Sequence, residues 1–208
     1  QFAGNYDGIH TIYNDGTFTA RNSTILIQGN EGLWLGGANN ISFYKLTINN
    51  FYGVSLGTNI FIQNQLQLTD GIVYVNTPYK LTCQANGRAN IGNSNAYIDG
   101  LFDQIIASTT IQSFNVPIGK NNAYRPMVLN VKHSTFGAVT YSSEAINISP
   151  RSFNYTLPPT LSLVSDVRYY QVNRTGPANF SLGSITLSYG PDDGVTDYTQ
   201  LRVAQYGG

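Results

Sequence analysis

The repeated spacing of short apolar segments in the first half of the chain restricts its fold more than any other feature. Three leucines recur at intervals of 20 residues: Leu26, Leu46 and Leu66. The glycines that precede a second set of short apolar segments are 21 and 18 residues apart: Gly32, Gly53 and Gly71. A period of about 20 residues is typical of a solenoid, in which each coil buries its apolar face by stacking on the next.

Strand-like alternation accompanies this repeat along nearly the whole chain. Apolar and polar side chains alternate in segments such as Leu46-Thr47-Ile48 and Leu66-Gln67-Leu68, and Gly, Asn and Asp separate the segments. This pattern predicts an all-β protein. Asparagine suits the corners between strands because it tolerates left-handed backbone and hydrogen-bonds within its own turn. An antiparallel meander with hairpins at a similar spacing is the alternative to a solenoid.

The second half of the chain has a different pattern. The repeat fades in the polar stretch from Asn86 to Asn95, strand character resumes at Ala96, and the spacing is irregular from Ser113 onward. We therefore predict a β-solenoid-like region over residues 1–98 and an Ig-like β-sandwich over residues 99–208, with the boundary near residues 98–112. The strands expected in the second region are residues 112–116, 126–131, 137–141, 166–173, 184–189 and 200–206.

The composition indicates where such a chain works. Charged residues make up 11% of it, and 11 Lys and Arg balance 11 Asp and Glu. This balance argues against a nucleic-acid-binding surface and against a polybasic membrane anchor. No apolar run reaches the length of about 20 residues that a membrane helix needs. The single cysteine, Cys83, cannot form a disulfide within the chain, and its setting after Leu81 predicts a small buried apolar side chain.

A neutral surface rich in Asn, Thr and Tyr favours an extracellular or cell-surface protein. The export signal of such a protein would have been removed or would lie upstream of this segment.

Several motifs resemble a recurring segment of large secreted proteins of the Bacteroidota. They are Tyr97-Ile98-Asp99-Gly100, residues 113–120, Tyr124-Arg125-Pro126, Arg168-Tyr169-Tyr170, residues 185–190 and Asp192-Asp193-Gly194-Val195, together with residues 46–57 and 66–71 upstream. These proteins are adhesin-like, lie at the cell surface or outside the cell, and are typically exported by the type IX secretion system. The resemblance implies lineage and location; its motifs are turns and strands rather than catalytic signatures.

The residue types that carry most hydrolytic chemistry are scarce. A nucleophilic triad needs a positioned histidine, and His10 and His133 are the two histidines of the chain. Glycoside hydrolysis usually needs two facing carboxylates, whereas glutamate occurs only at Glu31 and Glu144 and most aspartates precede glycine in turn-like pairs. We expect no catalytic residues, no bound cofactor and no enzymatic activity. Asp192, Asp193 and Asp197 form an acidic group that allows a weaker expectation of a calcium site.

The segment Phe114–Val131 contains Gly119-Lys120, but it lacks the remaining residues of a phosphate-binding loop. Pro117 suits a strand end, and Asn121-Asn122 suits a turn. We therefore predict a β-hairpin that opens the second region, in which Arg125 pairs with a carboxylate or stacks on Tyr124.

Aromatic doublets are the candidate interaction surface. They are Phe43-Tyr44, Phe51-Tyr52 and Tyr169-Tyr170. Successive side chains of a strand point to opposite faces, so one ring of each doublet should face outward. Such rings can contact a neighbouring subunit or stack on sugars.

Two functions follow from these observations. The favoured one is a non-catalytic extracellular structural or adhesin segment, a building block of a surface fibre whose partners are further copies of itself or neighbouring domains of the same protein. The alternative is a carbohydrate-binding module of a secreted polysaccharide-active protein, with glycans as its partners.

Overall fold

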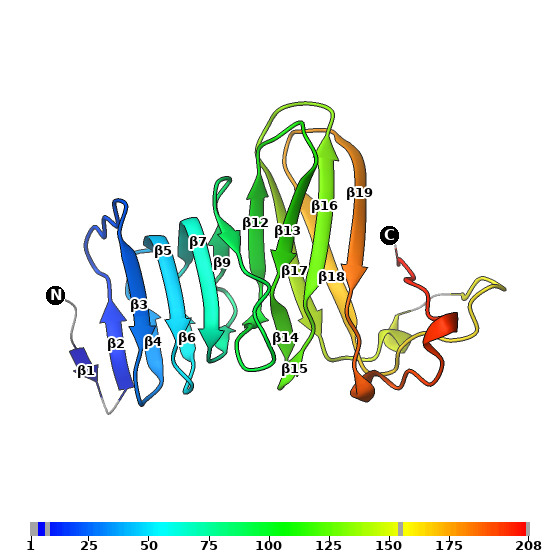
Figure 1. The fold of residues 1–208 in the computed structure, drawn as a ribbon, viewed down its shortest axis with the longest axis horizontal. Coiled ribbons are helices and arrows are strands. Elements are labelled where there is room, and N and C mark those ends of the chain that lie inside the picture. Colours follow the sequence, from blue (N-terminus) through cyan, green and yellow to red (C-terminus); the bar gives the residue numbers. More distant parts are fainter. Residues whose placement is uncertain (1–3, 7–8, 154–155, 207–208) are drawn as a thin grey trace.

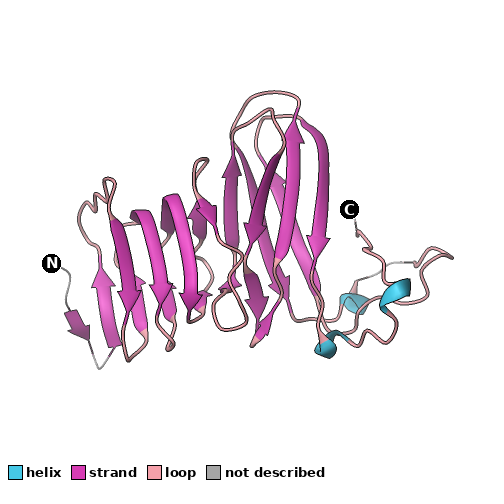
Figure 2. Ribbon diagram, viewed as in Figure 1, coloured by secondary structure: helices cyan, strands magenta, loops and turns pink. Residues whose placement is uncertain are grey.

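The computed structural model describes residues 4–6, 9–153 and 156–206 of the chain. Their architecture is all-β, with a two-layered arrangement of strands that runs from one end of the molecule to the other (Figures 1 and 2). The first part is a β-solenoid-like stack of about five turns, and each turn contributes one strand to each of two parallel sheets.

The first sheet lines one side of the stack in the order β1-β2-β4-β6-β8-β11-β14-β15. All the pairs from β2 to β14 are parallel, while β1 and β15 pair antiparallel at the two edges. Its strands are β1 (Gly4–Tyr6), β2 (Ile9–Tyr13), β4 (Leu33–Gly36), β6 (Val54–Gly57), β8 (Val73–Val75), β11 (Ile98–Gly100), β14 (Ile118–Lys120) and β15 (Ala123–Tyr124).

The second sheet lines the other side in the order β18-β17-β12-β9-β7-β5-β3, and β10 pairs with β7 beside it. Its strands are β3 (Thr24–Gln28), β5 (Ile41–Asn49), β7 (Ile60–Asp70), β9 (Leu81–Cys83), β10 (Arg88–Ala89), β12 (Phe102–Ile106), β17 (Val139–Ile146) and β18 (Tyr169–Thr175). The parallel pairing of β3, β5, β7, β9 and β12 confirms a solenoid-like stack in place of an antiparallel meander.

The core is a set of apolar columns that continue from coil to coil. In one column Ile41 pairs with Ile60, Ile60 with Leu81 and Leu81 with Phe102, and these four side chains are at most 1% exposed. Fully burying one such side chain stabilises the fold by roughly 1.5–3 kcal/mol. No coil could bury this face alone, so the columns explain why the repeat exists.

The register corrects one detail of the repeat. Leu46 pairs with Leu66 as the spacing predicts, but Ile25 is the residue that pairs with Leu46. Leu26 lies one position further along β3 and is 51% exposed. A one-residue shift moves a strand residue to the opposite face, which is why the interval of 20 residues between Leu26 and Leu46 does not mark equivalent positions.

Asparagine side chains connect successive coils at the corners. The Asn50 amide donates to the Glu31 carbonyl at 2.8 Å, one coil away. Asn90 makes two bonds to Leu68, accepting from its N–H at 2.8 Å and donating to its carbonyl at 2.9 Å. These bonds satisfy backbone groups that the short strands leave unpaired.

The C-terminal strands extend the solenoid. β12 pairs parallel with β9 on one side and antiparallel with β17 on the other, so the second sheet passes from the stack into antiparallel strands without a break. Opposite it lies a three-stranded antiparallel sheet made of β13 (Gln112–Val116), β16 (Met127–His133) and β19 (Phe180–Leu187). The Ig-like sandwich expected here is not confirmed.

Parallel hydrogen-bonded pairs cross the position that was predicted as the domain boundary. Ile98 pairs with Val73 on one side and with Ile118 on the other, and Phe102 pairs with Leu81. The division into regions 1–98 and 99–208 stays a prediction.

Five of the six strands expected in the second half are present: residues 112–116 have the predicted bounds, and the other four have shifted ends. The sixth, residues 200–206, is irregular chain that follows the 3-10 helix η3 (Tyr198–Gln200), and its alternating Leu201 and Val203 are exposed because neither packs against the core. The other 3-10 helices are η1 (Pro150–Ser152) and η2 (Pro191–Asp193).

Candidate functional site

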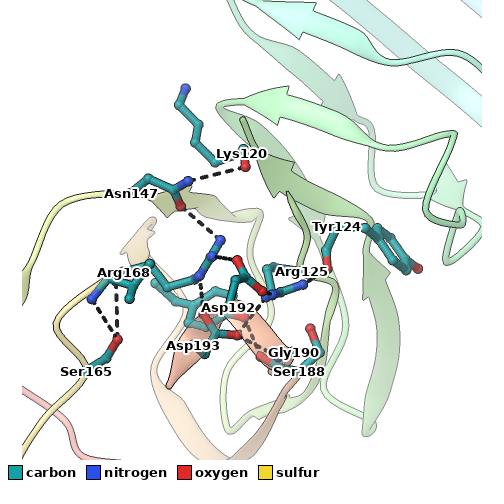
Figure 3. Close-up of polar contacts among 12 residues, drawn as sticks. Lys120, Tyr124, Arg125, Asn147, Ser165, Arg168, Ser188, Gly190, Asp192 and Asp193 are labelled. Atoms are coloured by element: carbon teal, nitrogen blue, oxygen red, sulfur yellow. Dashed lines mark hydrogen bonds and ion pairs between the residues drawn. The ribbon is translucent and has the colours of Figure 1, made fainter. Parts of the chain in front are cut away.

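Four charged residues from distant segments meet at the C-terminal end of the stack (Figure 3). Arg125 follows β15, Arg168 precedes β18, and Asp192 and Asp193 lie in η2; we call these four residues the Arg–Asp clamp. Each guanidinium pairs with both carboxylates, with Arg125 Nε 2.8 Å from Asp193 Oδ2. The clamp confirms that Arg125 pairs with a carboxylate.

The clamp is mostly closed to solvent and its charges cancel. The side chains of Arg125, Arg168 and Asp193 are 9%, 4% and 8% exposed, and Asp192 is 48% exposed. Asp193 also accepts the Gly190 N–H at 2.6 Å. Two cations and two anions that satisfy one another hold the start of β18 against the hairpin and the segment after β19.

This pairing bears directly on the expected calcium site. The Asp192 and Asp193 carboxylates are occupied by guanidinium groups, whereas Asp197 accepts from Thr199 at 2.9 Å in η3. Within the part of the chain that the structure describes, no group of three or more His, Cys, Asp or Glu side chains gathers to hold a metal ion.

A second charged group lies next to the clamp. The Lys120 ammonium is 2.9 Å from Asp99 and 3.6 Å from Glu144. The Asn147 side-chain amide connects Lys120 to the clamp: it donates to the Lys120 carbonyl at 3.3 Å and accepts from Arg168 at 3.0 Å (Figure 3). Burial by itself lowers the pKa of Lys120, but its hydrogen bond to Asp99 and the charges of Asp99 and Glu144 outweigh burial and raise that pKa. Both groups join segments that meet at the junction between the solenoid and the C-terminal strands.

The stretch Phe114–Val131 is the predicted hairpin. Val116 pairs with Met127 in β13 and β16, and Gly119 pairs with Tyr124 in β14 and β15. The hairpin belongs to two sheets. Its β14 and β15 strands, next to the turn, complete the first sheet, and its β13 and β16 strands belong to the three-stranded sheet. Asn121 and Asn122 adopt left-handed backbone at its turn, with φ of 49° and 65°.

The aromatic doublets do not gather into one surface. Phe43 is buried against Phe18, with 5.3 Å between ring centroids, and Tyr44 beside it is partly exposed. Phe51 and Tyr52 lie at the turn after β5 and are 73% and 58% exposed. Tyr169 packs on Phe153 at 4.9 Å, and the Tyr170 hydroxyl donates to the Ser188 carbonyl at 2.5 Å. Only the Phe51-Tyr52 pair is strongly exposed.

A different aromatic group gathers on the outer face of the first sheet. Trp34 lies between Leu33 and Leu35, and Tyr74 lies between Val73 and Val75, whose side chains face the core, so both rings point outward. Tyr13 follows core-facing Ile12 and lies 5.9 Å from the Trp34 ring. We call the full set the aromatic strip; it consists of Tyr13, Trp34, Tyr74, Tyr97 and Tyr124.

Glycines let these rings lie close to the sheet. A Cβ atom at Gly36 or Gly57 would come within 2.0 and 2.1 Å of the Trp34 ring, so the indole covers two neighbouring strands. A Cβ atom at Gly119 would come within 2.6 Å of the Tyr97 ring, which packs 6.0 Å from Tyr124. Burial, with smaller contributions from the charges of Asp99 and Tyr74, raises the pKa of Tyr97 to about 12.

Sequence reasoning missed this strip because its members are scattered as single residues. The available signal was positional: Trp34 and Tyr74 occupy the same place within their coils, 40 residues apart, and Gly36 and Gly57 pair directly. The register of the coils was needed to align them.

Among the described residues, several apolar side chains at the two ends of the stack are only partly buried against the core. Ile12, Ile25 and Leu33 are partly buried core contacts at the N-terminal end. Tyr170, Val172, Ile185 and Leu187 are their counterparts in β18 and β19 at the other end. Among the strands of the described residues, β3 pairs only with β5, β18 only with β17, and β19 only with β16.

The remaining chemically reactive side chains are buried or lie at the margin of the structure. His133 is buried, with its Nε2 2.8 Å from the Tyr141 hydroxyl and its Nδ1 3.2 Å from the Ser108 carbonyl. Cys83 is buried and free as predicted, and burial raises its pKa to about 12. His10 lies in β2, and its side chain is outside the described part.

No protein-family profile, curated protein or solved structure matches this chain. The resemblance to secreted Bacteroidota proteins therefore stays a prediction. A search of the described residues for membrane spans finds no helix with the length and apolar character that crossing requires.

Proposed function

We propose that this chain is a non-catalytic structural segment of an extracellular or cell-surface protein, and that it stacks end to end on further copies of itself. The observation that carries the proposal is the partial burial of apolar side chains at the two ends of the stack, described above. A solenoid covers its core by adding coils, so an adjoining copy completes at each end what another coil would complete. An adhesin or fibre component exported by the type IX system is the setting we propose for it.

The edge strands offer a way to join the copies. Lys45 donates its N–H to the Ser23 carbonyl at 3.2 Å, and in parallel pairing alternate residues face the same neighbour. Ile25 and Ile27 therefore direct their backbone groups toward β5, and Leu26 directs its own toward the open edge. An edge of this kind is a template for pairing with another strand.

The C-terminal end offers exposed apolar surface in addition to its edges. Residues beyond β19 lie next to this end (Figure 1), and Tyr198, Leu201 and Val203 among them are 73%, 42% and 62% exposed. Exposed apolar side chains that gather at one end of a molecule offer a surface for association. Association through it is favourable because it removes that surface from water.

The test is the assembly state as a function of protein concentration. Light scattering after size exclusion should detect oligomers, and negative-stain electron microscopy should show them joined end to end with a regular axial repeat. EDTA should not dissolve them, because the Asp192 and Asp193 carboxylates are paired with arginines. Leu26→Pro should reduce association by removing the outward N–H, while Leu26→Ala keeps that N–H and serves as the control. Circular dichroism verifies that both variants fold. Monomers at every concentration, or equal association of both variants, would contradict the proposal.

A further inference from the structure

The aromatic strip has the properties of a platform for an extended sugar chain. Trp34 lies over Gly36 and Gly57, and Tyr13 and Tyr74 flank it with 55% and 38% exposure. Rings that lie along a sheet offer their faces, and the apolar C–H faces of pyranose sugars pack on such faces. The flat geometry favours sugars whose C–H groups also lie on flat faces.

The strip also extends in one direction. Trp34, Ser55 and Tyr74 are directly paired across β4, β6 and β8, so they form one row perpendicular to the strands. Neighbouring strands are about 4.8 Å apart, which places the positions of Trp34 and Tyr74 roughly 10 Å from each other. A row of this length matches about two linked sugar rings, because one β-1,4-linked ring spans about one strand spacing.

The charge on this row identifies the class of sugar. The row of Thr11, Trp34, Ser55, Tyr74, Asp99 and Gly119 contains one ionisable acid, Asp99, and Lys120 neutralises it at 2.9 Å. Hydroxyl groups and a compensated ion pair complement a neutral ligand that hydrogen-bonds. A polyanionic glycan would find no uncompensated cation here.

From these three properties we infer that the outer face of the first sheet binds a neutral, extended, β-1,4-linked polysaccharide across the rings of Tyr13, Trp34 and Tyr74. Tyr13 pairs with Gly36 and therefore lies on the same face, beside the row of Trp34, Ser55 and Tyr74. Chains of this linkage are flat ribbons whose sugar faces lie parallel to the ribbon. The rings lie on the outer face of the first sheet, whereas the side chains at the open ends face the core, so a fibre of this chain would repeat the site in every copy. This inference does not depend on the proposed assembly, because monomers would bind as well.

The single tryptophan of the chain makes the test direct. Because Trp34 is the only tryptophan, its emission reports on this site alone. Titration with cellohexaose or chitohexaose should shift the emission saturably and protect the indole from acrylamide quenching, whereas maltohexaose, which is curved, should do so more weakly. Absence of any emission change with all three sugars would overturn the inference.

Three variants separate the strip from other exposed aromatics. Trp34→Ala and Tyr74→Ala should each weaken cellohexaose binding by up to about tenfold, as measured by calorimetry. Gly57→Ala keeps the indole but pushes it off the sheet, because the added Cβ would lie 2.1 Å from it, and should weaken binding similarly. Phe51→Ala is the matched control, since Phe51 is 73% exposed but lies in the turn after β5 rather than on a strand of the first sheet, and its loss should leave affinity unchanged. Equal losses in Phe51→Ala and Trp34→Ala, with both proteins folded, would overturn the inference.

Discussion

The position of a residue within its coil determines whether its side chain is buried and how readily it ionises. Cys83 follows Thr82 in β9, and its column neighbour Ile62 is likewise fully buried. Tyr97 belongs to the aromatic strip on the outer face, yet its side chain has no exposed surface. Gly119 has no side chain, so the Tyr97 ring can pack flat against the sheet there. Burial then determines the ionisation of both groups, and this leads to two measurable consequences.

The Cys83 thiol should be inert in the native protein. Its pKa of about 12 leaves it protonated at pH 8, and burial prevents a reagent from reaching it. We expect modification by a disulfide reagent to be undetectable without denaturant and to become complete once urea unfolds the chain. Rapid modification of the native protein would show that β9 opens locally.

Alkaline pH should destabilise the fold through Tyr97. An unfolded tyrosine ionises near pH 10, whereas folded Tyr97 keeps its proton to about pH 12. The unfolded chain therefore releases this proton first, and stability falls as pH rises from about 10 to 12. Tyr124, Tyr141, Tyr170 and Lys120, whose pKa values are also raised, contribute in the same direction.

Urea midpoints between pH 8 and pH 11.5 measure this effect. Tyr97→Phe keeps the ring but removes the ionisable group, so its midpoint should fall less steeply than that of the wild type. An identical slope in the two proteins would rule out Tyr97 as a source of the pH dependence.

At the scale of elements, the Arg–Asp clamp joins parts that strand pairing alone does not hold. It connects the end of the hairpin, the start of β18 and the segment after β19, which contact one another through side chains. The sequence indicated that Arg125 either pairs with a carboxylate or stacks on Tyr124, but it could not identify the carboxylate because Asp193 lies 68 residues away.

Removing one arginine of the clamp should be costly. Arg168→Ala leaves Asp193, which is 8% exposed, with a single remaining cation, and breaking a buried pair in this way typically costs about 3–5 kcal/mol. Arg151→Ala is the matched control, because its pair with Asp166 is 2.5 Å long but more than half exposed, where pairs are worth about 0–1 kcal/mol. Urea unfolding of both variants measures the difference, and equal losses would show that the clamp contributes no more than a surface pair.

At the scale of the whole molecule, the core and the second sheet are continuous from the solenoid into the antiparallel strands. Leu81 of β9, Phe102 of β12 and Ser143 of β17 are joined by successive pairings. Because each part covers the end of the other, neither half buries its core alone.

This continuity predicts a single unfolding transition. Trp34 fluorescence reports on the N-terminal coils, and hydrogen exchange of amides in β16 and β17 reports on the C-terminal strands. The two signals should change together with increasing urea. Two separated transitions would support the predicted division near residue 98 into independent domains.

The sequence alone determined the local choices. Three patterns were sufficient to predict the local structure: the alternation of apolar and polar side chains, the interval near 20 residues, and Gly and Asn at the corners. They predicted the all-β class, the solenoid-like first half, the buried Cys83 and the hairpin at Phe114–Val131. Each depends on neighbours within one or two coils, where the pattern of side chains limits the backbone to few conformations.

Only the tertiary structure decided what depends on register and on contacts between distant segments. A shift of one residue places Ile25 rather than Leu26 in the core column. In the other sheet, the pairing of β4, β6 and β8 aligns Trp34 with Tyr74 and brings Gly57 under the indole. The three aromatic doublets lie apart, and only Phe51-Tyr52 is strongly exposed, because strand pairing rather than sequence proximity determines which rings meet. Register and pairing are set by the packing of the entire stack, so no single stretch of the sequence contains them.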